Sequence, residues 1–177
     1  MDLPAYLERI HYQGPLDSTL ETLAGLHLAH TSSIPFENLD IQLGRRIHLD
    51  LAALQAKLVQ ARRGGYCFEH NTLFAAALQA LGFTVTLREA RVSQGGGQWG
   101  LRNHLAPEVQ LPGGPWLADV GFGGDGSLGP VPLDGSDQAW FGDHRRILPQ
   151  GHRQVLQAWD CCNRLCHPVP IPAYVNR

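Results

Sequence analysis

Hydrophobic side chains recur at helical spacing through the first 82 residues of the chain. The pattern predicts helices that begin at Asp2, within the capping box Ser18-Thr19-Leu20-Glu21, at Asp50 and at about Cys67. The last of these is expected to run to Leu81, where Gly82 ends it. The positions expected to face inward are Leu3, Leu7, Ile10, Leu20, Leu23, Ala24, Leu28, Leu51, Leu54 and Leu58. Residues 1–82 are therefore predicted to form a helical domain.

Residues 83–159 change to a pattern that is typical of strands. The run Pro112-Gly113-Gly114-Pro115 is a strong turn signal, and apolar segments flank it on both sides. We therefore expect a β-hairpin around this turn. Alternation and β-branched residues place the expected strands at residues 84–92, 103–111, 116–122 and 154–159. Helices followed by antiparallel strands predict an α+β fold.

Neither the helical nor the alternating pattern continues beyond Trp159. Pro168, Pro170 and Pro172 should prevent a helix interior or a central strand. Residues 160–177 are therefore expected to be an irregular tail and not a domain. The tail also carries Cys161, Cys162, Cys166 and His167, but adjacent cysteines match no common zinc-ligand spacing, and no metal site is expected.

Composition narrows the function classes. The chain has 177 residues, of which 44% are hydrophobic and 17% charged, and its formal net charge is −2. Without a basic excess, a nucleic-acid partner is not expected. No apolar run is long enough to span a bilayer, and the acidic N-terminus does not resemble a signal peptide, so no membrane role is expected. The spacing of the four cysteines is not a disulfide framework, which predicts a cytoplasmic protein with a reduced Cys67.

Cys67 is the first candidate for chemistry. It follows Gly64-Gly65 and begins an apolar helical run, so unpaired backbone N–H groups and the positive end of the helix dipole would favour its thiolate. The paired glycines would let the backbone turn sharply and approach a ligand. A buried structural cysteine is the alternative, because free cysteines are among the most buried residues in proteins.

A nucleophilic cysteine needs a nearby histidine and a third group that fixes the histidine tautomer. His104 and Asp119 are the candidates, because they lie on the two arms of the expected hairpin and an odd index sum puts them on one sheet face. A tight loop over residues 112–115 would place Asp119 opposite Glu108, too far from His104. Direct contact then needs a different register or a bulge. A surface histidine and a strand-end capping carboxylate are the alternatives.

Four parts of the sequence occur together in a characteristic order. They are Pro35-Phe36-Glu37-Asn38-Leu39, Arg63-Gly64-Gly65-Tyr66-Cys67-Phe68-Glu69-His70-Asn71, the strand residue His104, and Asp119-Val120-Gly121-Phe122-Gly123. In this order and approximate spacing they resemble the arylamine N-acetyltransferase family. The resemblance covers roughly residues 1–158.

The resemblance implies a papain-like core, in which a helical domain with Cys67 precedes a β domain with His104 and Asp119. It implies ping-pong transfer: acetyl-CoA acetylates Cys67, CoA leaves, and an arylamine, hydrazine or N-hydroxyarylamine takes the acetyl group. Acetyl-CoA would be a co-substrate, and no bound cofactor is expected. Amide synthases of the same family and papain-like cysteine hydrolases remain alternatives, although the first and last of the four segments argue against the hydrolases.

The resemblance also implies supporting roles for Arg63 and Glu37, which are expected to pair beneath the nucleophile, and for Asn71. Phe122 would shape the acceptor pocket, and the glycines after Asp119 would approach the coenzyme. The substrate and coenzyme pocket is expected to include Phe36, Phe68, Gly100, Leu101, Phe122, Gly123 and Gly124.

The chain departs from the family pattern at its end. Family members are longer and carry a third α/β domain that closes over the cleft, whereas the family-like pattern here fades after Val155-Leu156-Gln157. We therefore expect a C-terminally shortened member without the third domain. The surface left uncovered would favour self-association. An inactive truncated remnant is the further alternative.

Overall fold

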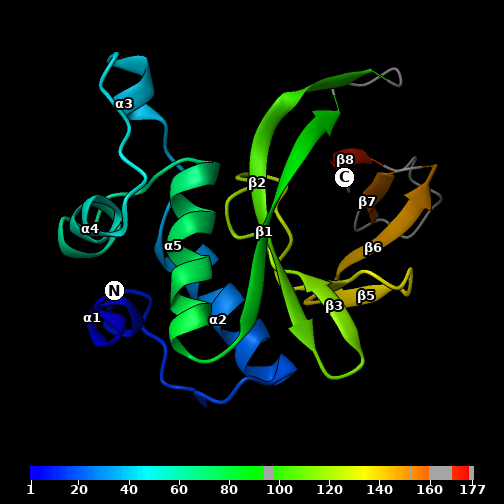
Figure 1. Cartoon of the computed structure of the whole chain (residues 1–177), viewed down its shortest axis with the longest axis horizontal. Helices are drawn as coiled ribbons and strands as arrows, with labels where there is room; N and C mark the ends of the chain where they lie inside the picture. Colours follow the sequence, from blue (N-terminus) through cyan, green and yellow to red (C-terminus); the bar gives the residue numbers. More distant parts are fainter. Residues whose placement is uncertain (94–97, 152, 160–168, 176–177) are drawn as a thin grey trace.

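A computed structural model describes residues 1–93, 98–151, 153–159 and 169–175 (Figure 1). The helices are α1 (Leu3–Arg9), α2 (Leu20–Ser33), α3 (Leu39–Gln42), α4 (Leu51–Leu54), the π-helix η1 (Gln55–Gln60) and α5 (Cys67–Ala80). Side-chain caps confirm two of the predicted starts: Asp2 accepts from Ala5 N at 3.1 Å and Asp50 from Ala53 N at 3.0 Å. The cap of α2 is Thr19, not the Ser18 of the expected capping box.

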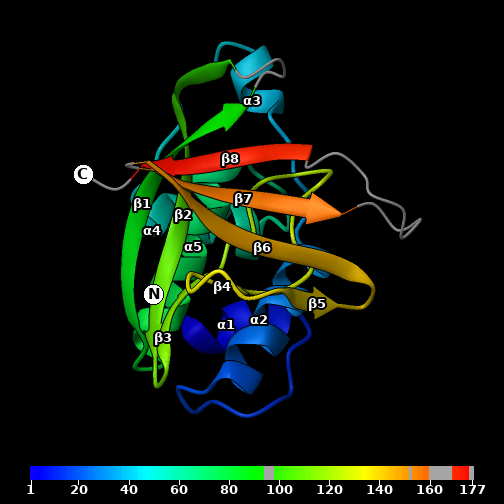
Figure 2. The same cartoon turned by 90° about the vertical axis from the view of Figure 1, so that its right-hand side faces the viewer.

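The strands form one antiparallel sheet. They are β1 (Thr84–Ser93), β2 (Trp99–Leu111), β3 (Gly114–Leu117), β4 (Val131–Pro132), β5 (Gln138–Trp140), β6 (Asp143–Gln150), β7 (Arg153–Trp159) and β8 (Val169–Val175). Their order in the sheet is β4-β3-β2-β1-β8-β7-β6-β5. The helices lie on one side of β1 and β2, and β5 to β8 lie on the other side (Figures 1 and 2). The predicted α+β fold is confirmed.

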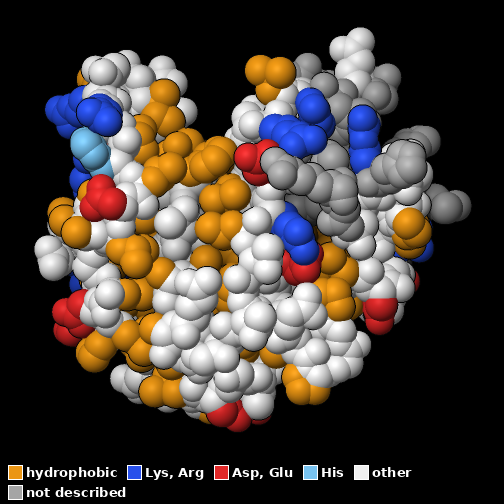
Figure 3. Space-filling model, viewed as in Figure 1, with side chains coloured by type: hydrophobic (Ala, Val, Ile, Leu, Met, Phe, Trp, Pro, Cys, Tyr) orange, Lys and Arg blue, Asp and Glu red, His pale blue; other side chains and the backbone are white. Residues whose placement is uncertain are grey.

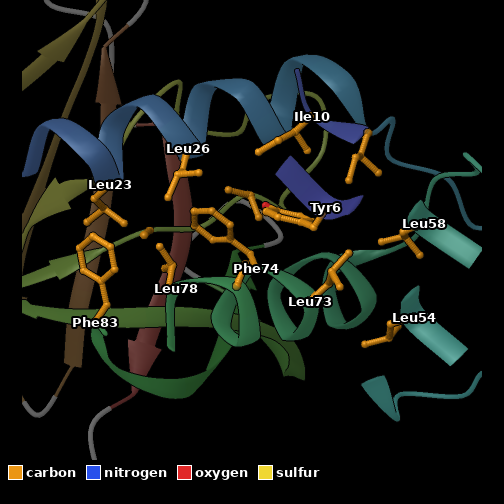
Figure 4. Close-up of a cluster of buried hydrophobic side chains, with 14 of the residues drawn as sticks. Tyr6, Ile10, Leu23, Leu26, Leu54, Leu58, Leu73, Phe74, Leu78 and Phe83 are labelled. Atoms are coloured by element: carbon orange, nitrogen blue, oxygen red, sulfur yellow. The ribbon is translucent and has the colours of Figure 1, made fainter. Parts of the chain in front are cut away.

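Two buried clusters hold these layers together. The larger cluster joins the helices to one face of β1–β3, with Tyr6, Leu26, Phe74 and Val109 fully buried (Figure 4). The smaller cluster lies on the opposite face of β1 and β2, where Ala90 and Ala106 meet side chains of the later strands. Cross-layer burial of this kind supplies most of the favourable free energy of folding. The strand pair β1–β2 therefore packs on both faces and anchors both halves of the molecule.

Two helical faces differ from the sequence pattern. Leu51 is 39% exposed, although it was expected to face inward. The segment after Leu54 continues as a π-helix, so one 3.6-residue period does not extend from Leu51 to Leu58. In α2 the buried face carries His27 and His30, while Leu20, Ala24 and Leu28 are half-buried. The hydrophobic pattern missed this face because histidine does not mark a core position.

Residues 169–175 form strand β8, so the expectation that the segment beyond Trp159 contains no strand is wrong here. β8 lies between β7 and β1 (Figure 2). It pairs with β1 through Ala173 and Tyr174, whereas Pro170 and Pro172 lie earlier in the strand, beside β7. Pro172 also falls at an irregularity of the β7–β8 register. Proline is tolerated at such irregularities and where a strand lacks a second partner. The tail's cysteines, His167 and Pro168 lie outside the described residues.

Exposed apolar side chains gather on the segment around α3. They include Phe36, Leu39, Ile41 and Leu43, of which Leu43 is 64% exposed. In Figure 3, hydrophobic side chains cover much of the hollowed surface between the α3 lobe and the end of β1–β2. In the part of the chain that the structure describes, no helix is long and apolar enough to cross a membrane.

The buried histidines of α2 predict a pH-dependent stability. Burial lowers the pKa of His27 to about 4, outweighing the hydrogen bond of its Nε2 with Ser127 O and two carboxylates. Below pH 6.5, the ordinary pKa of histidine, the His27 imidazole binds a proton in the unfolded chain but not in the folded chain. The stabilisation is complete above about pH 6.5 and falls by about 3 kcal/mol as the pH drops to 4. Urea unfolding between pH 7 and pH 4 should show a flatter pH dependence for His27→Gln.

The exposed His48 provides the control for this measurement. His48→Gln should retain the pH dependence of the unaltered protein. A His27→Gln variant that also retains it in full would show that burial of this ring does not control acid stability.

Candidate active site

Cys67 stands at the first position of α5, and the preceding chain is held tightly there. Gly65 forms a parallel bridge with Phe36, with Glu37 N donating to Gly65 O at 2.8 Å. A Cβ atom at Gly64 would overlap the carbonyl oxygen of Pro35. The paired glycines therefore allow close contact with residues 35–37, whereas the sequence had suggested contact with a ligand. This contact holds the chain directly before the start of α5.

His104 lies on β2 beside the start of α5. The Cys67 side chain is near enough to the His104 imidazole to help raise the pKa of that ring, and its Sγ donates to Asn103 O at 3.7 Å. His104 Nε2 and Asp119 Oδ2 are 2.6 Å apart. Because Nε2 faces Asp119, Nδ1 is the nitrogen left to face the thiol. The structure thus brings Cys67, His104 and Asp119 together as the sequence predicted.

The hairpin achieves this contact through a register that differs from the expected one. Leu117 lies opposite Glu108, and the turn has only the two residues Pro112 and Gly113. Asp119 is therefore not opposite Glu108, as the expected four-residue loop would have required; continued past Leu117, this register would carry it two positions closer to His104. Strand β3 also ends at Leu117 and does not reach Phe122. Freed from the ladder, Asp119 can turn toward the imidazole.

Asn71 holds the Asp119 carboxylate from the helix side. Its Nδ2 donates to Asp119 Oδ1 at 2.8 Å and to Leu105 O at 2.6 Å, and its Oδ1 accepts from Val120 N at 3.0 Å. Asp119 Oδ1 accepts a further hydrogen bond from Gly121 N at 2.9 Å. Asn71 is fully buried, so these bonds are sheltered from water.

The electrostatic surroundings of His104 and Asp119 favour a protonated imidazole and an ionised carboxylate. Burial by itself would lower the pKa of His104, but the Asp119 carboxylate and the Cys67 side chain raise this pKa well above its ordinary value. Burial likewise would raise the pKa of Asp119, but the His104 ring, Asn71 and the Gly121 N–H lower it. An imidazolium beside the thiol would stabilise a thiolate.

The expected pair of Arg63 and Glu37 is present within a larger ion cluster. Arg63 Nη2 is 2.6 Å from Glu37 Oε1, and Arg63 Nη1 is 3.0 Å from Asp40 Oδ2. Lys57 joins the cluster at 3.0 Å from Asp40. The Glu37 side chain is 15% exposed and that of Arg63 is 36% exposed, so the pair is partly buried.

A cavity of about 330 Å³ lies next to Asp119. Of the expected pocket residues, Phe36, Gly123 and Gly124 line it. Its other lining residues are Thr31, Ser32, Ile34, His70, Asp119, Val120, Gly126, Ser127 and Leu128. Most of these were not anticipated, because they come from the end of α2 and from a loop without a sequence period.

The other expected pocket residues lie elsewhere. Phe68 stacks on Tyr66 at 5.5 Å between ring centroids, and Phe122 meets the His104 ring edge-on at 5.5 Å. Gly100 accepts a hydrogen bond from Arg91, and Leu101 is 79% exposed. These four residues do not line the 330 Å³ cavity.

Sequence reasoning also missed a buried histidine pair. His70 Nδ1 and His30 Nε2 are 2.8 Å apart, and the other nitrogen of His30 lies 2.8 Å from Tyr6 Oη. Burial lowers the pKa of both rings. His70 stands three residues after Cys67 in the same motif, which was the available signal. In the described ranges, no group of three or more His, Cys, Asp or Glu side chains could hold a metal ion.

Comparison with known proteins places the chain in a family. A family model described as N-acetyltransferase matches residues 19–159 of the chain, a span that contains Cys67, His104 and Asp119. A curated arylamine N-acetyltransferase / N-hydroxyarylamine O-acetyltransferase of Salmonella typhimurium is 43% identical over 158 residues. The chain belongs to the arylamine N-acetyltransferase family. The resemblance inferred from the four segments is confirmed.

Solved arylamine N-acetyltransferases share the fold. The enzyme from Salmonella typhimurium matches with a TM-score of 0.90 and 39% identity, covering 98% of this chain and 62% of that one. The Mycobacterium marinum enzyme in complex with CoA matches with a TM-score of 0.84 and 38% identity, covering 98% of this chain and 64% of that one. In the sequence comparison, the match covers 88% of this chain and 56% of the curated Salmonella protein. The chain thus spans little more than half the length of that relative.

The Asn71 hydrogen bonds predict a large stability effect for this family member. Asn71→Ala would leave the Val120 N–H without its Asn71 acceptor and Leu105 O without its Asn71 donor in the interior. We expect the free energy of unfolding to fall by about 3 kcal/mol, as measured by urea unfolding. Asn38→Ala is the control, because Asn38 is exposed and makes no side-chain cap bond at α3. Equal stability of the two variants would contradict the anchoring role of Asn71.

The His104–Asp119 contact predicts an imidazolium at neutral pH. Nitrogen-15 NMR of the imidazole should show His104 protonated near pH 7. Asp119→Asn removes the carboxylate that raises the pKa of His104 against the effect of burial. The pKa of His104 should therefore fall, and the ring should become neutral. Asp137→Asn, which alters a carboxylate of an exposed side chain, should leave the His104 signal unchanged. A neutral His104 in the unaltered protein would overturn this electrostatic description.

Proposed function

We propose that this chain transfers an acetyl group from acetyl-CoA to an arylamine, hydrazine or N-hydroxyarylamine through a thioester on Cys67. The observation that carries the proposal is the contact series Asp119–His104–Cys67 at the start of α5. The arrangement resembles that of papain-like enzymes, because the nucleophile is on a helix and the histidine is on the sheet that packs against this helix. Family membership supports the same chemistry.

The first half-reaction loads the enzyme. The Cys67 thiolate attacks the carbonyl carbon of acetyl-CoA, and its electron pair forms the new C–S bond. Backbone N–H groups in the first turn of α5 are available to stabilise the oxyanion. As the tetrahedral intermediate collapses, the bond to the CoA sulfur breaks and the His104 imidazolium gives its proton to that sulfur. CoA leaves as the thiol, and acetyl-Cys67 remains.

The second half-reaction delivers the acetyl group. The acceptor nitrogen attacks the thioester carbonyl, and neutral His104 takes the proton that this nitrogen loses. Collapse of the intermediate breaks the bond to Cys67 and releases the thiolate beside an imidazolium. A thiolate stabilised in this way both attacks and leaves well. For an N-hydroxyarylamine, the hydroxyl oxygen is an alternative attacking atom.

The 330 Å³ cavity beside Asp119 would suit a small acceptor, although neither Cys67 nor His104 lines it. Its volume is at the lower end of the range for small-molecule sites. Phe36 supplies an aromatic face there, and Gly123, with φ at +87°, leaves room beside that ring. The relatives fit this assignment: the Salmonella protein is named for arylamine and N-hydroxyarylamine acetylation, and the Mycobacterium marinum structure contains CoA.

The test is incubation with acetyl-CoA followed by intact-mass measurement. We expect one added acetyl group, mapped to Cys67 by peptide analysis, and its removal by an arylamine. Cys67→Ala should lose the adduct and lower acetyl transfer about a thousandfold or more. A control protein in which Cys161, Cys162 and Cys166 are changed to Ala should retain both the acetyl adduct and acetyl transfer. A Cys67→Ala protein that still acetylates the amine would exclude this mechanism, and peptide cleavage in place of acetylation would favour a cysteine hydrolase.

A further inference from the structure

A buried carboxylate caps the helix that carries the proposed nucleophile. Glu69 is 3% exposed, and its Oε2 accepts a hydrogen bond from Tyr66 N at 3.1 Å. Its carboxylate therefore lies against the residue that directly precedes Cys67. A negative charge in the first helical turn stabilises the helix. The same charge would oppose a thiolate at Cys67, so capping and nucleophile activation conflict.

Lys57 contacts the same carboxylate. Its Nζ is 2.8 Å from Glu69 Oε1 and 3.0 Å from Oε2, so it binds both carboxylate oxygens. The same Nζ is 3.0 Å from Asp40 Oδ2 and 3.9 Å from Glu37 Oε1. The side chain is only 16% exposed. Burial would lower the pKa of Lys57, but Glu69 and Asp40 raise it, so the ammonium stays charged.

Lys57 reaches this position from a distinct local structure. It belongs to the π-helix η1, in which Ala61 N donates to Ala56 O at 2.8 Å. The backbone oxygen of Lys57 accepts a hydrogen bond from Arg63 N at 3.1 Å, close to the chain that leads into α5. Single π-turns inside helices are frequent at functional sites. Here the π-turn carries the cation that meets the nucleophile helix.

The charges around Cys67 are balanced in two groups. On the helical side, the carboxylates Glu37, Asp40 and Glu69 face the cations Lys57, Arg63 and Arg45. On the sheet side, Asp119 faces His104. On α5 itself His70 is buried, and burial lowers its pKa, which leaves it neutral. Tyr66 stays neutral because burial and the nearby Cys67 and Glu69 raise its pKa.

We propose that Lys57 is a positioning residue for Cys67: it neutralises Glu69, so that this carboxylate can cap α5 without disfavouring the thiolate. The proposal rests on the proposed role of Cys67 as the nucleophile. Lys57 does not touch the reacting atoms, and it acts through Glu69. Its removal leaves a buried anion beside the thiol, whereas removal of both charges leaves the helix cap nearly intact. The expected effect on the Cys67 thiolate therefore depends on the charge that remains next to it, and not on the loss of the contact between Lys57 and Glu69.

The test is the rate at which neutral iodoacetamide alkylates Cys67 near pH 7, followed by peptide mass analysis that separates Cys67 from the other cysteines. Lys57→Met should react about tenfold more slowly. Glu69→Gln retains an oxygen for the Tyr66 N–H and should react at least as fast as the unaltered protein. The double variant should return to within about twofold of the unaltered rate. Raising the pH should restore the rate of Lys57→Met, as a shortage of thiolate requires.

Arg45→Met is the matched control, because it removes one positive charge from the exposed end of the same cluster, where the side chain is 63% exposed. It should leave the alkylation rate unchanged, since exposed charges are screened. Slow alkylation in all three Lys57 and Glu69 variants, or an unchanged rate in Lys57→Met, would overturn the proposal. If Lys57→Met does not fold, a Glu69→Gln variant that reacts more than about threefold slower than the unaltered protein decides against it.

The result separates this proposal from the proposed function. Alkylation needs no acetyl transfer, so the expected sign pattern can occur even if acetyl-CoA never acetylates Cys67; in that case the acetyltransferase proposal alone fails. If Cys67 is acetylated and yet the double variant is as slow as Lys57→Met, the role of Lys57 is structural and this proposal alone fails.

Discussion

The hydrogen bonds of Asn71 join α5 to the sheet at the point where the candidate chemistry needs both. Asn71 shares helix α5 with Cys67, and it binds the Asp119 carboxylate directly. Helix α5 therefore positions both Cys67 and Asp119, while His104 lies between them on β2. Hydrophobic packing alone is not directional and would not set these distances. The short polar contacts convert a packed interface into a defined geometry.

The buried charges on both sides of Cys67 are compensated at short range. The helical cluster around Lys57 and the His104–Asp119 pair show the same arrangement, in which the shortest contacts between opposite charges are 2.6–3.0 Å. Burying an unpaired charge is costly, so each pair fixes the backbone segments that carry it. The two groups flank the start of α5, which makes the position of Cys67 depend on both halves of the fold.

The histidines show how the same burial leads to opposite chemical states. His104 faces a carboxylate, and the pKa of its ring is raised. His27 and His30 are buried without such a partner in contact with the ring, and burial lowers the pKa of each. A chain with several buried histidines can therefore hold one as an acid beside a thiol and use others as neutral core residues. The neighbour of the ring, and not its depth, decides between these states.

The amino-acid sequence by itself determined the features that depend on a few neighbouring residues. The caps at Asp2 and Asp50 and the start of α5 at Cys67 were predictable, because a cap or a helical turn involves residues three or four positions apart. The grouping of Cys67, His104 and Asp119 was implied by the family resemblance of their motifs and not by the expected hairpin register. The tertiary structure decided the hairpin register, strand β8 and the place of Lys57 beneath α5. These depend on packing between distant segments, which no local period encodes.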